Sequence, residues 1–120
     1  MPTEIEIIDQ AIVRISKGWT QGAFARDAAG RECQTLEEDP VCWCLAGSLM
    51  VGRVPSLKQF PEQELVVLRL HRKIRETMGS PFGIISWNDT PSRTKEEVLS
   101  LLRAVRTDLG VELIEQEKSK

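Results

Sequence analysis

An unbroken run of eleven uncharged residues, from Val41 to Val51, restricts the fold more than any other feature of this sequence. Carboxylates at 37–39 and a proline precede the run, as is typical of a helix N-terminus with Asp39 as cap and Pro40 in first position. A helix without charge on any side cannot lie on the surface. We therefore predict a central buried helix over 41–51. Its length excludes a bilayer span, which takes about 20 residues.

Three other segments have apolar residues at helical spacing on one face. Thr3 and Thr94 each stand three residues before a glutamate, which is the capping-box pattern of a helix start. Gly110 is expected to end the last helix, and residues 111–114 are expected to form a short docked strand or a frayed helix. The predicted helices span residues 4–17, 61–78 and 94–109.

The helix over 61–78 has apolar residues outside its main core-facing arc. Leu65 and Leu68 point away from that arc and need a second cover, so we expect the beginning of this helix to be buried on two sides. Arg69, Arg72 and Lys73 share one face, with Arg75 nearby, and we favour a solvated face suited to a helix C-terminus over a phosphate site.

The remaining segments lack helical phase. Residues 18–33 are expected to form a short, irregular β-hairpin, with a type I turn from Asp27 to Gly30. Residues 52–58 are predicted to be a connection, and residues 82–87 an extended or irregular segment before a turn at 88–91.

Together these elements predict a mainly α fold, α+β at most. About four helices pack around the buried helix at 41–51, with the hairpin between the first two. The 120 residues suit a single domain, 1–120, with an ordered core over about 3–114 and a flexible tail at 115–120.

Charge and cysteine content limit the partners and the location. Sixteen Lys and Arg against 18 Asp and Glu give a net charge of −2, which argues against nucleic acid and membrane surfaces as partners. The first residues lack a signal-peptide pattern, so we expect a cytoplasmic location. Three cysteines, an odd number, favour reduced thiols and no disulfide.

The sequence gives little support for a metal site or a catalytic site. Cys42 and Cys44, with Cys33 and His71, invite a zinc interpretation. Residues two apart on a helix point to nearly opposite sides, so we expect no metal and no cofactor. His71 has an unperturbed pKa near neutrality, but a half-buried structural imidazole is the favoured interpretation over a general base. We predict no catalytic residue.

Two tryptophan-containing loops form the strongest candidate site, at 18–22 and 87–94. Asn88 and Asp89 fit an Asx-turn whose carboxylate is bound by Arg93 or by the amides of the last helix, which is a structural role. Alternatively, they face a cleft in which a tryptophan stacks on a flat ligand. The structural role is favoured. The candidate binding residues are Trp19, Arg26, Asp27, His71, Trp87, Asn88, Asp89 and Arg93.

The same loops carry a resemblance to a known family. Segments 18–22, 43–49 and 87–98 read GWxQG, WCLxGSL and WNDxPxRTxxEV, and resemble an uncharacterised bacterial and phage family of unknown function over roughly residues 5–105. In that family alanine usually follows the glycine of the second motif, where this chain has Ser48. The third usually has glycine where Ser92 stands. The resemblance implies a compact helical module of small genomes and mobile elements, and no established reaction.

These observations favour a non-enzymatic module that binds another protein through a partly apolar surface such as Leu65 and Leu68. The resemblance adds an accessory role in phages or mobile elements. The alternative is a small enzyme or ligand-binding protein that uses a cleft between the hairpin and the loop at 87–94.

Overall fold

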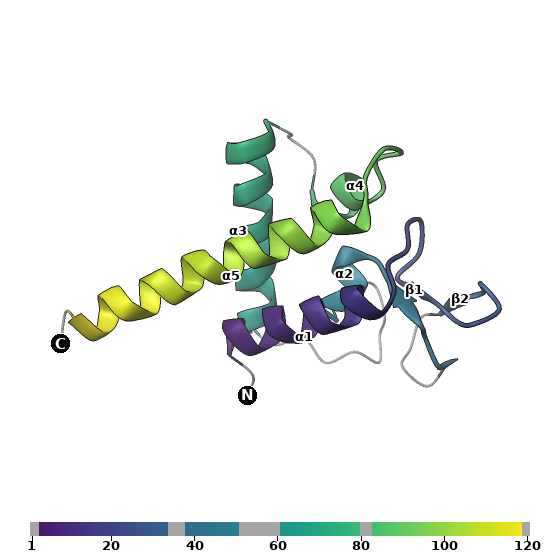
Figure 1. The fold of residues 1–120 in the computed structure, drawn as a ribbon, viewed down its shortest axis with the longest axis horizontal. Helices are drawn as coiled ribbons and strands as arrows, with labels where there is room; N and C mark the ends of the chain where they lie inside the picture. The colour runs from purple at the N-terminus through teal and green to yellow at the C-terminus, as the bar shows by residue number, and fades with distance from the viewer. Residues whose placement is uncertain (1–2, 34–37, 51–60, 80–82, 119–120) are drawn as a thin grey trace.

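A computed structural model describes residues 3–33, 38–50, 61–79 and 83–118. The fold is mainly α, with a small antiparallel sheet, as predicted (Figure 1). The helices are α1 (Glu4–Lys17), α2 (Leu45–Ser48), α3 (Pro61–Met78), α4 (Ile84–Asn88) and α5 (Lys95–Lys118). The strands are β1 (Ala25–Arg26), β2 (Glu32–Cys33) and β3 (Cys42–Trp43).

The long helices form where the apolar spacing and the caps predict them. α1 starts at Thr3, whose hydroxyl accepts from the Glu6 amide at 3.1 Å. The second capping box is reciprocal, because the Glu97 amide donates to Thr94 Oγ1 at 3.2 Å and the Thr94 amide donates to Glu97 Oε1 at 2.9 Å. Both boxes satisfy backbone donors that have no partner within the helix.

The core lies where α1, α3 and α5 pack against one another, with α2 packed against α1. α1 and α5 run side by side along much of their length, and α3 crosses both (Figure 1). Ile8, Leu45, Leu70 and Leu102 are completely buried, one from each of these four helices. Every residue from Trp43 to Leu49 is buried, as expected, whereas Val41 at the start of the uncharged run is exposed.

The predicted helix over 41–51 is nevertheless wrong in its conformation. Cys42 and Trp43 are extended and pair antiparallel with β1, and the Trp43 amide donates to the Gly18 carbonyl at 3.0 Å. Asp39 has a left-handed φ of 56°, so it does not cap a helix, and Cys44 takes that place. Only four residues are helical, because the strand partners satisfy the backbone before them.

The hairpin is confirmed, with β1 central in the strand order β2-β1-β3. Ala25 faces Cys33 on one side and Trp43 on the other. The Gly30 amide donates to the Asp27 carbonyl at 2.9 Å, which closes the expected turn, and Gly30 adopts a φ of +82°.

Three other expectations differ from the structure. Residues 84–88 form α4 instead of an irregular segment, and α5 continues through Gly110 to Lys118. Leu65 and Leu68 are 48% and 62% exposed, so the start of α3 is not buried on two sides. The connection at 52–58 and Phe82 lie outside the described residues.

Among the described residues, none of the helices combines the length and hydropathy that crossing a bilayer requires. The molecule is elongated, with extents of 51 × 32 × 23 Å. The C-terminal part of α5 projects away from the other elements and accounts for much of this length (Figure 1).

Candidate functional site

One buried side chain, Asn88, joins three segments of the fold. Its Oδ1 accepts from Trp19 Nε1 at 2.8 Å and from the Leu45 amide at 3.0 Å. Its Nδ2 donates to the Thr20 carbonyl at 3.2 Å and to Asp89 Oδ1 at 3.0 Å. The carbonyl oxygen thus accepts twice and both amide hydrogens are donated. Asn88 holds the loop at 18–22 against the N-terminus of α2.

The loop at 18–22 also holds the backbone and carboxylate at the end of α4. Gln21 Nε2 donates to the Asn88 carbonyl at 2.9 Å and to the Thr90 carbonyl at 2.8 Å. The Gly22 amide donates to Asp89 Oδ1 at 3.0 Å, and Gly22 has a left-handed φ of 78° that glycine adopts without strain. The two loops of the candidate site are therefore brought together, as their shared tryptophan pattern suggested.

Asp89 has a different partner from the expected ones. Neither Arg93 nor the amides of α5 bind its carboxylate, which accepts from the Gly22 amide instead. Asp89 itself is exposed, and within the described residues its Oδ2 makes no hydrogen bond. The site can therefore offer one free carboxylate oxygen at its rim, beside a fully bonded amide at its centre.

Arg93 stabilises the exit from α4. Its guanidinium carbon lies 4.0 Å from the ring centroid of the buried Trp87, a cation–π contact. Arg93 Nε donates to the Trp87 carbonyl at 3.0 Å, and Nη1 pairs with Glu97 at 3.0 Å. The Thr94 amide, followed by the Thr94 hydroxyl and Arg93, lowers the pKa of Glu97.

Arg26 and Asp27 lie at the other side of the loop, in the hairpin. Arg26 donates to Thr20 Oγ1 at 3.1 Å and to the Gln21 carbonyl at 3.2 Å. Asp27 Oδ1 accepts from the Ala29 and Arg31 amides at 2.9 Å each. The Arg31 amide is the main cause of the lowered pKa of Asp27. Arg26 thus supports the joint, whereas Asp27 stabilises its own turn.

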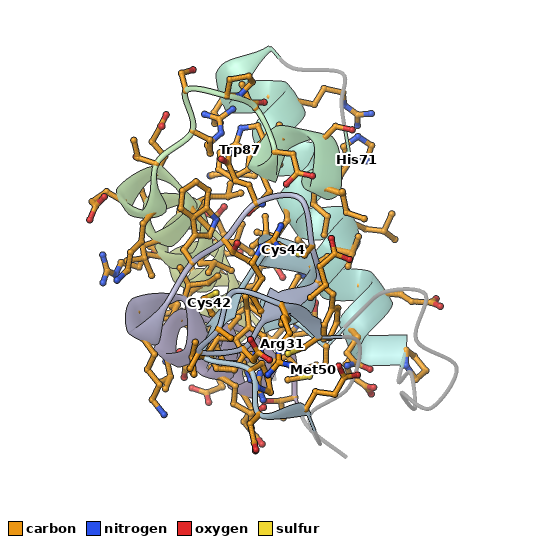
Figure 2. The ribbon with its side chains drawn as sticks, turned by 90° about the vertical axis from the view of Figure 1, so that its right-hand side faces the viewer. Arg31, Cys42, Cys44, Met50, His71 and Trp87 are labelled. Carbon is orange, nitrogen blue, oxygen red and sulfur yellow. The ribbon has the colours of Figure 1, made fainter. Side chains whose placement is uncertain are left out.

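His71 is not part of this arrangement. It lies partly buried on the side of α3, whereas Trp87 belongs to α4 (Figure 2). Within the described residues, His71 contributes to none of the hydrogen bonds between the two loops. The structure therefore brings together six of the eight candidate residues, Trp19, Arg26, Trp87, Asn88, Asp89 and Arg93, and leaves out His71 and the side chain of Asp27.

The segments that meet at Asn88 lie within a stretch that matches a known family. A profile of DUF6197, a family of unknown function, matches residues 1–108, nine-tenths of the chain. The chain belongs to this family. No curated protein and no solved structure matches it. DUF6197 membership confirms the expected relationship to a family of unknown function, and the match stops within α5, before its projecting end.

In this DUF6197 member the three cysteines are free thiols. Cys44 caps α2, because its Sγ accepts from the Gly47 amide at 3.3 Å, and burial raises its pKa. In the described part of the chain, no three His, Cys, Asp or Glu residues are grouped so that they could hold a metal ion.

A second surface lies between α3 and α5, away from the candidate loops. It is a groove of about 460 Å³. We call its exposed part the α3 stripe, four side chains at spacings of three and four residues on one face of α3. The stripe consists of Leu65, Leu68, Arg72 and Arg75.

An ion-pair network forms the base of this groove. Arg69 pairs with Glu112 of α5 at 2.8 Å and with Glu4 of α1 at 2.7 Å. These two partners, Glu112 first, raise the pKa of Arg69 further above its ordinary value. The outward leucines were visible in the sequence. Their position beside α5 was not, because Gly110 indicated that α5 ended before Glu112.

Proposed function

We propose that this DUF6197 member is a non-enzymatic protein-binding module that holds an acidic amphipathic helix of its partner against the α3 stripe. The observation that carries the proposal is the exposure of Leu65 and Leu68 at 48% and 62%, side by side at the groove next to α5. Helix-in-groove recognition uses such apolar anchors at spacings of three and four residues.

The positive charge of the stripe indicates that the partner helix is acidic. Arg69 is neutralised by two carboxylates at the base of the groove. Arg72 and Arg75 line the same groove and make no ion pair among the described residues. Leucines beside uncompensated guanidinium groups favour a helix that presents apolar residues flanked by Asp or Glu. This arrangement gives the basic face a role beyond a solvated helix C-terminus.

The hydrogen bonds within the candidate loops favour a protein-binding role over the small-enzyme or ligand-binding alternative. Asn88 uses its whole hydrogen-bonding capacity inside the fold, and Asp89 uses one oxygen there. A catalytic or ligand-binding amide needs groups directed at the ligand. The three free thiols suit a reducing compartment, so we place the module in the cytoplasm. The resemblance stated above supports an accessory role in phages or mobile elements.

The proposal is tested with a designed helical peptide that carries leucines on one face and glutamates beside them. A second peptide replaces every glutamate by lysine. Fluorescence anisotropy of the labelled peptides should show binding of the acidic peptide only, and binding should weaken as salt screens the arginines. Leu68→Glu should weaken it by about tenfold or more, a loss typical of a central anchor.

Val13→Glu is the matched control, because Val13 is 53% exposed on α1, outside the groove. Circular dichroism should show both variants folded. Equal binding of the two peptides, or an equal effect of Leu68→Glu and Val13→Glu, would overturn the assignment of the stripe as the binding surface.

A further inference from the structure

The end of α5 beyond Gly110 has three exposed apolar side chains. Val111, Leu113 and Ile114 are 49%, 47% and 54% exposed. Figure 1 shows this end of α5 projecting beyond the crossing with α3. Val111 and Leu113 are separated by about 200° around the helix, so apolar side chains point to more than one side. Such a helix end is suited to being enclosed by a partner surface.

The charge of this end is opposite to that of the α3 stripe. Residues 111–118 contain three glutamates and one basic residue, Lys118, so this end is acidic. Glu112 already pairs with Arg69 inside the chain, and Glu117 is exposed near the end of the helix. The projecting end thus has the chemistry that the stripe selects, apolar side chains beside carboxylates.

The projecting end of α5 cannot bind the α3 stripe of its own chain. Glu112 lines the groove from α5, so the helix leaves the groove at that point. α5 is continuous from Lys95 to Lys118, and a continuous helix does not turn back onto the surface beside it. The end of α5 is therefore available to a second molecule only.

We propose that two copies of this chain associate by reciprocal exchange, each laying the end of its α5 across the α3 stripe of the other. This inference rests on the proposed function, because it uses the same groove, and it names the partner helix. Two complementary surfaces on one chain, related by a two-fold axis, form a closed interface in which each contact occurs twice.

Sedimentation velocity over a concentration series tests the exchange. The wild type should form a dimer, with dissociation that increases with salt. Leu68→Glu in the stripe and Ile114→Glu in the helix end should each weaken the dimer by about tenfold or more, whereas Val13→Glu should not. Circular dichroism verifies that each variant is folded, which the exposure of all three positions leads us to expect.

Mixing the two interface variants gives the sharper result. In a mixed pair, the intact α5 end of Leu68→Glu meets the intact stripe of Ile114→Glu, so one of the two contacts is restored. The mixture should associate more strongly than either variant alone. No gain on mixing would overturn the reciprocal exchange, as would a wild type that stays monomeric at the highest concentration.

Truncation after Glu112 distinguishes this inference from the proposed function, because it keeps the carboxylate that pairs with Arg69 and lines the groove, and removes Leu113 and Ile114. The truncated chain should lose the dimer and still bind the acidic designed peptide through its stripe. A dimer that survives truncation would overturn the inference and leave the peptide result unaffected. Loss of peptide binding in the folded truncated chain would instead count against the stripe as a self-sufficient site.

Discussion

Replacing Asn88 by alanine should destabilise the fold strongly, because one side chain bridges segments that are far apart in the sequence. Four hydrogen bonds end on it, to Trp19, Thr20, Leu45 and Asp89. Each such bond contributes about 1 kcal/mol net, and leaving the buried Leu45 amide without an acceptor costs about 1–3 kcal/mol. The bond to exposed Asp89 adds little. We expect a loss of about 3–5 kcal/mol in the free energy of unfolding.

The assay is urea unfolding followed by far-ultraviolet circular dichroism, which does not depend on the tryptophans at the joint. Asp89→Ala is the matched control, since it removes a neighbouring exposed acceptor and should cost less than about 1 kcal/mol. Asn88→Asp keeps an oxygen acceptor but removes both N–H donors and buries a carboxylate next to Asp89, so it should also be strongly destabilising. A loss for Asn88→Ala no larger than that for Asp89→Ala would refute the role of Asn88 as the joint.

Three further predictions concern local contacts. Gly47→Ala should destabilise the fold by about 1–3 kcal/mol in the same assay, because an added Cβ would overlap the Phe24 carbonyl oxygen and shift α2; a stability equal to wild type would contradict this packing. The lowered pKa of Asp27 contributes stability above its ordinary value of 3.8 that is lost as pH falls through the folded-state pKa. Asp27→Asn should therefore be less stable than wild type near neutral pH, and the two should converge in strong acid; a constant difference would exclude the carboxylate as its source. Cys44 should react with a thiol reagent only on unfolding, because it is buried and burial raises its pKa; rapid labelling of the native protein at Cys44, read by mass spectrometry, would show an open α2.

Local signals account for what the sequence could predict of the fold. The capping boxes at Thr3 and Thr94 and the apolar periodicity act within one or two turns, so they locate the starts of α1 and α5 correctly. The Asp27 to Gly30 turn is also a local feature and was confirmed. In each case the information lies within a few residues of the structure that it specifies.

Long-range contacts account for what the sequence could not predict. Uncharged residues suit a buried strand as well as a buried helix, and Cys42 and Trp43 become extended only because β1 pairs with them. The extension of α5 past Gly110 has a local cause. Glycine inside a helix costs only about 1 kcal/mol relative to alanine, so Gly110 does not stop a helix whose flanking residues favour one.

The sequence predicted which two loops form the candidate site. It did not predict the hydrogen bonds between them. Trp19 and Asn88 stand 69 residues apart, and no local pattern states which atom of one meets which atom of the other. Sequence reasoning therefore grouped the two loops but expected Arg93 or the amides of the last helix to bind Asp89, whereas the Gly22 amide binds it in the structure. His71 was included for its chemistry alone, and its position on α3 removes it from the group.

The residues that join the loops and the residues that we propose for recognition lie in different parts of the chain. The motif residues around Asn88 determine how the loops meet, and they lie within the stretch that matches DUF6197. The projecting end of α5, beyond Gly110, lies outside that match, which ends at residue 108. A fold can be shared across a family while each member carries its own binding surface. The α3 stripe lies within the matched region. The α5 end that we propose as its occupant lies outside that region. A chain truncated after Glu112, which keeps the groove lining, should then bind a different acidic helix at the same groove.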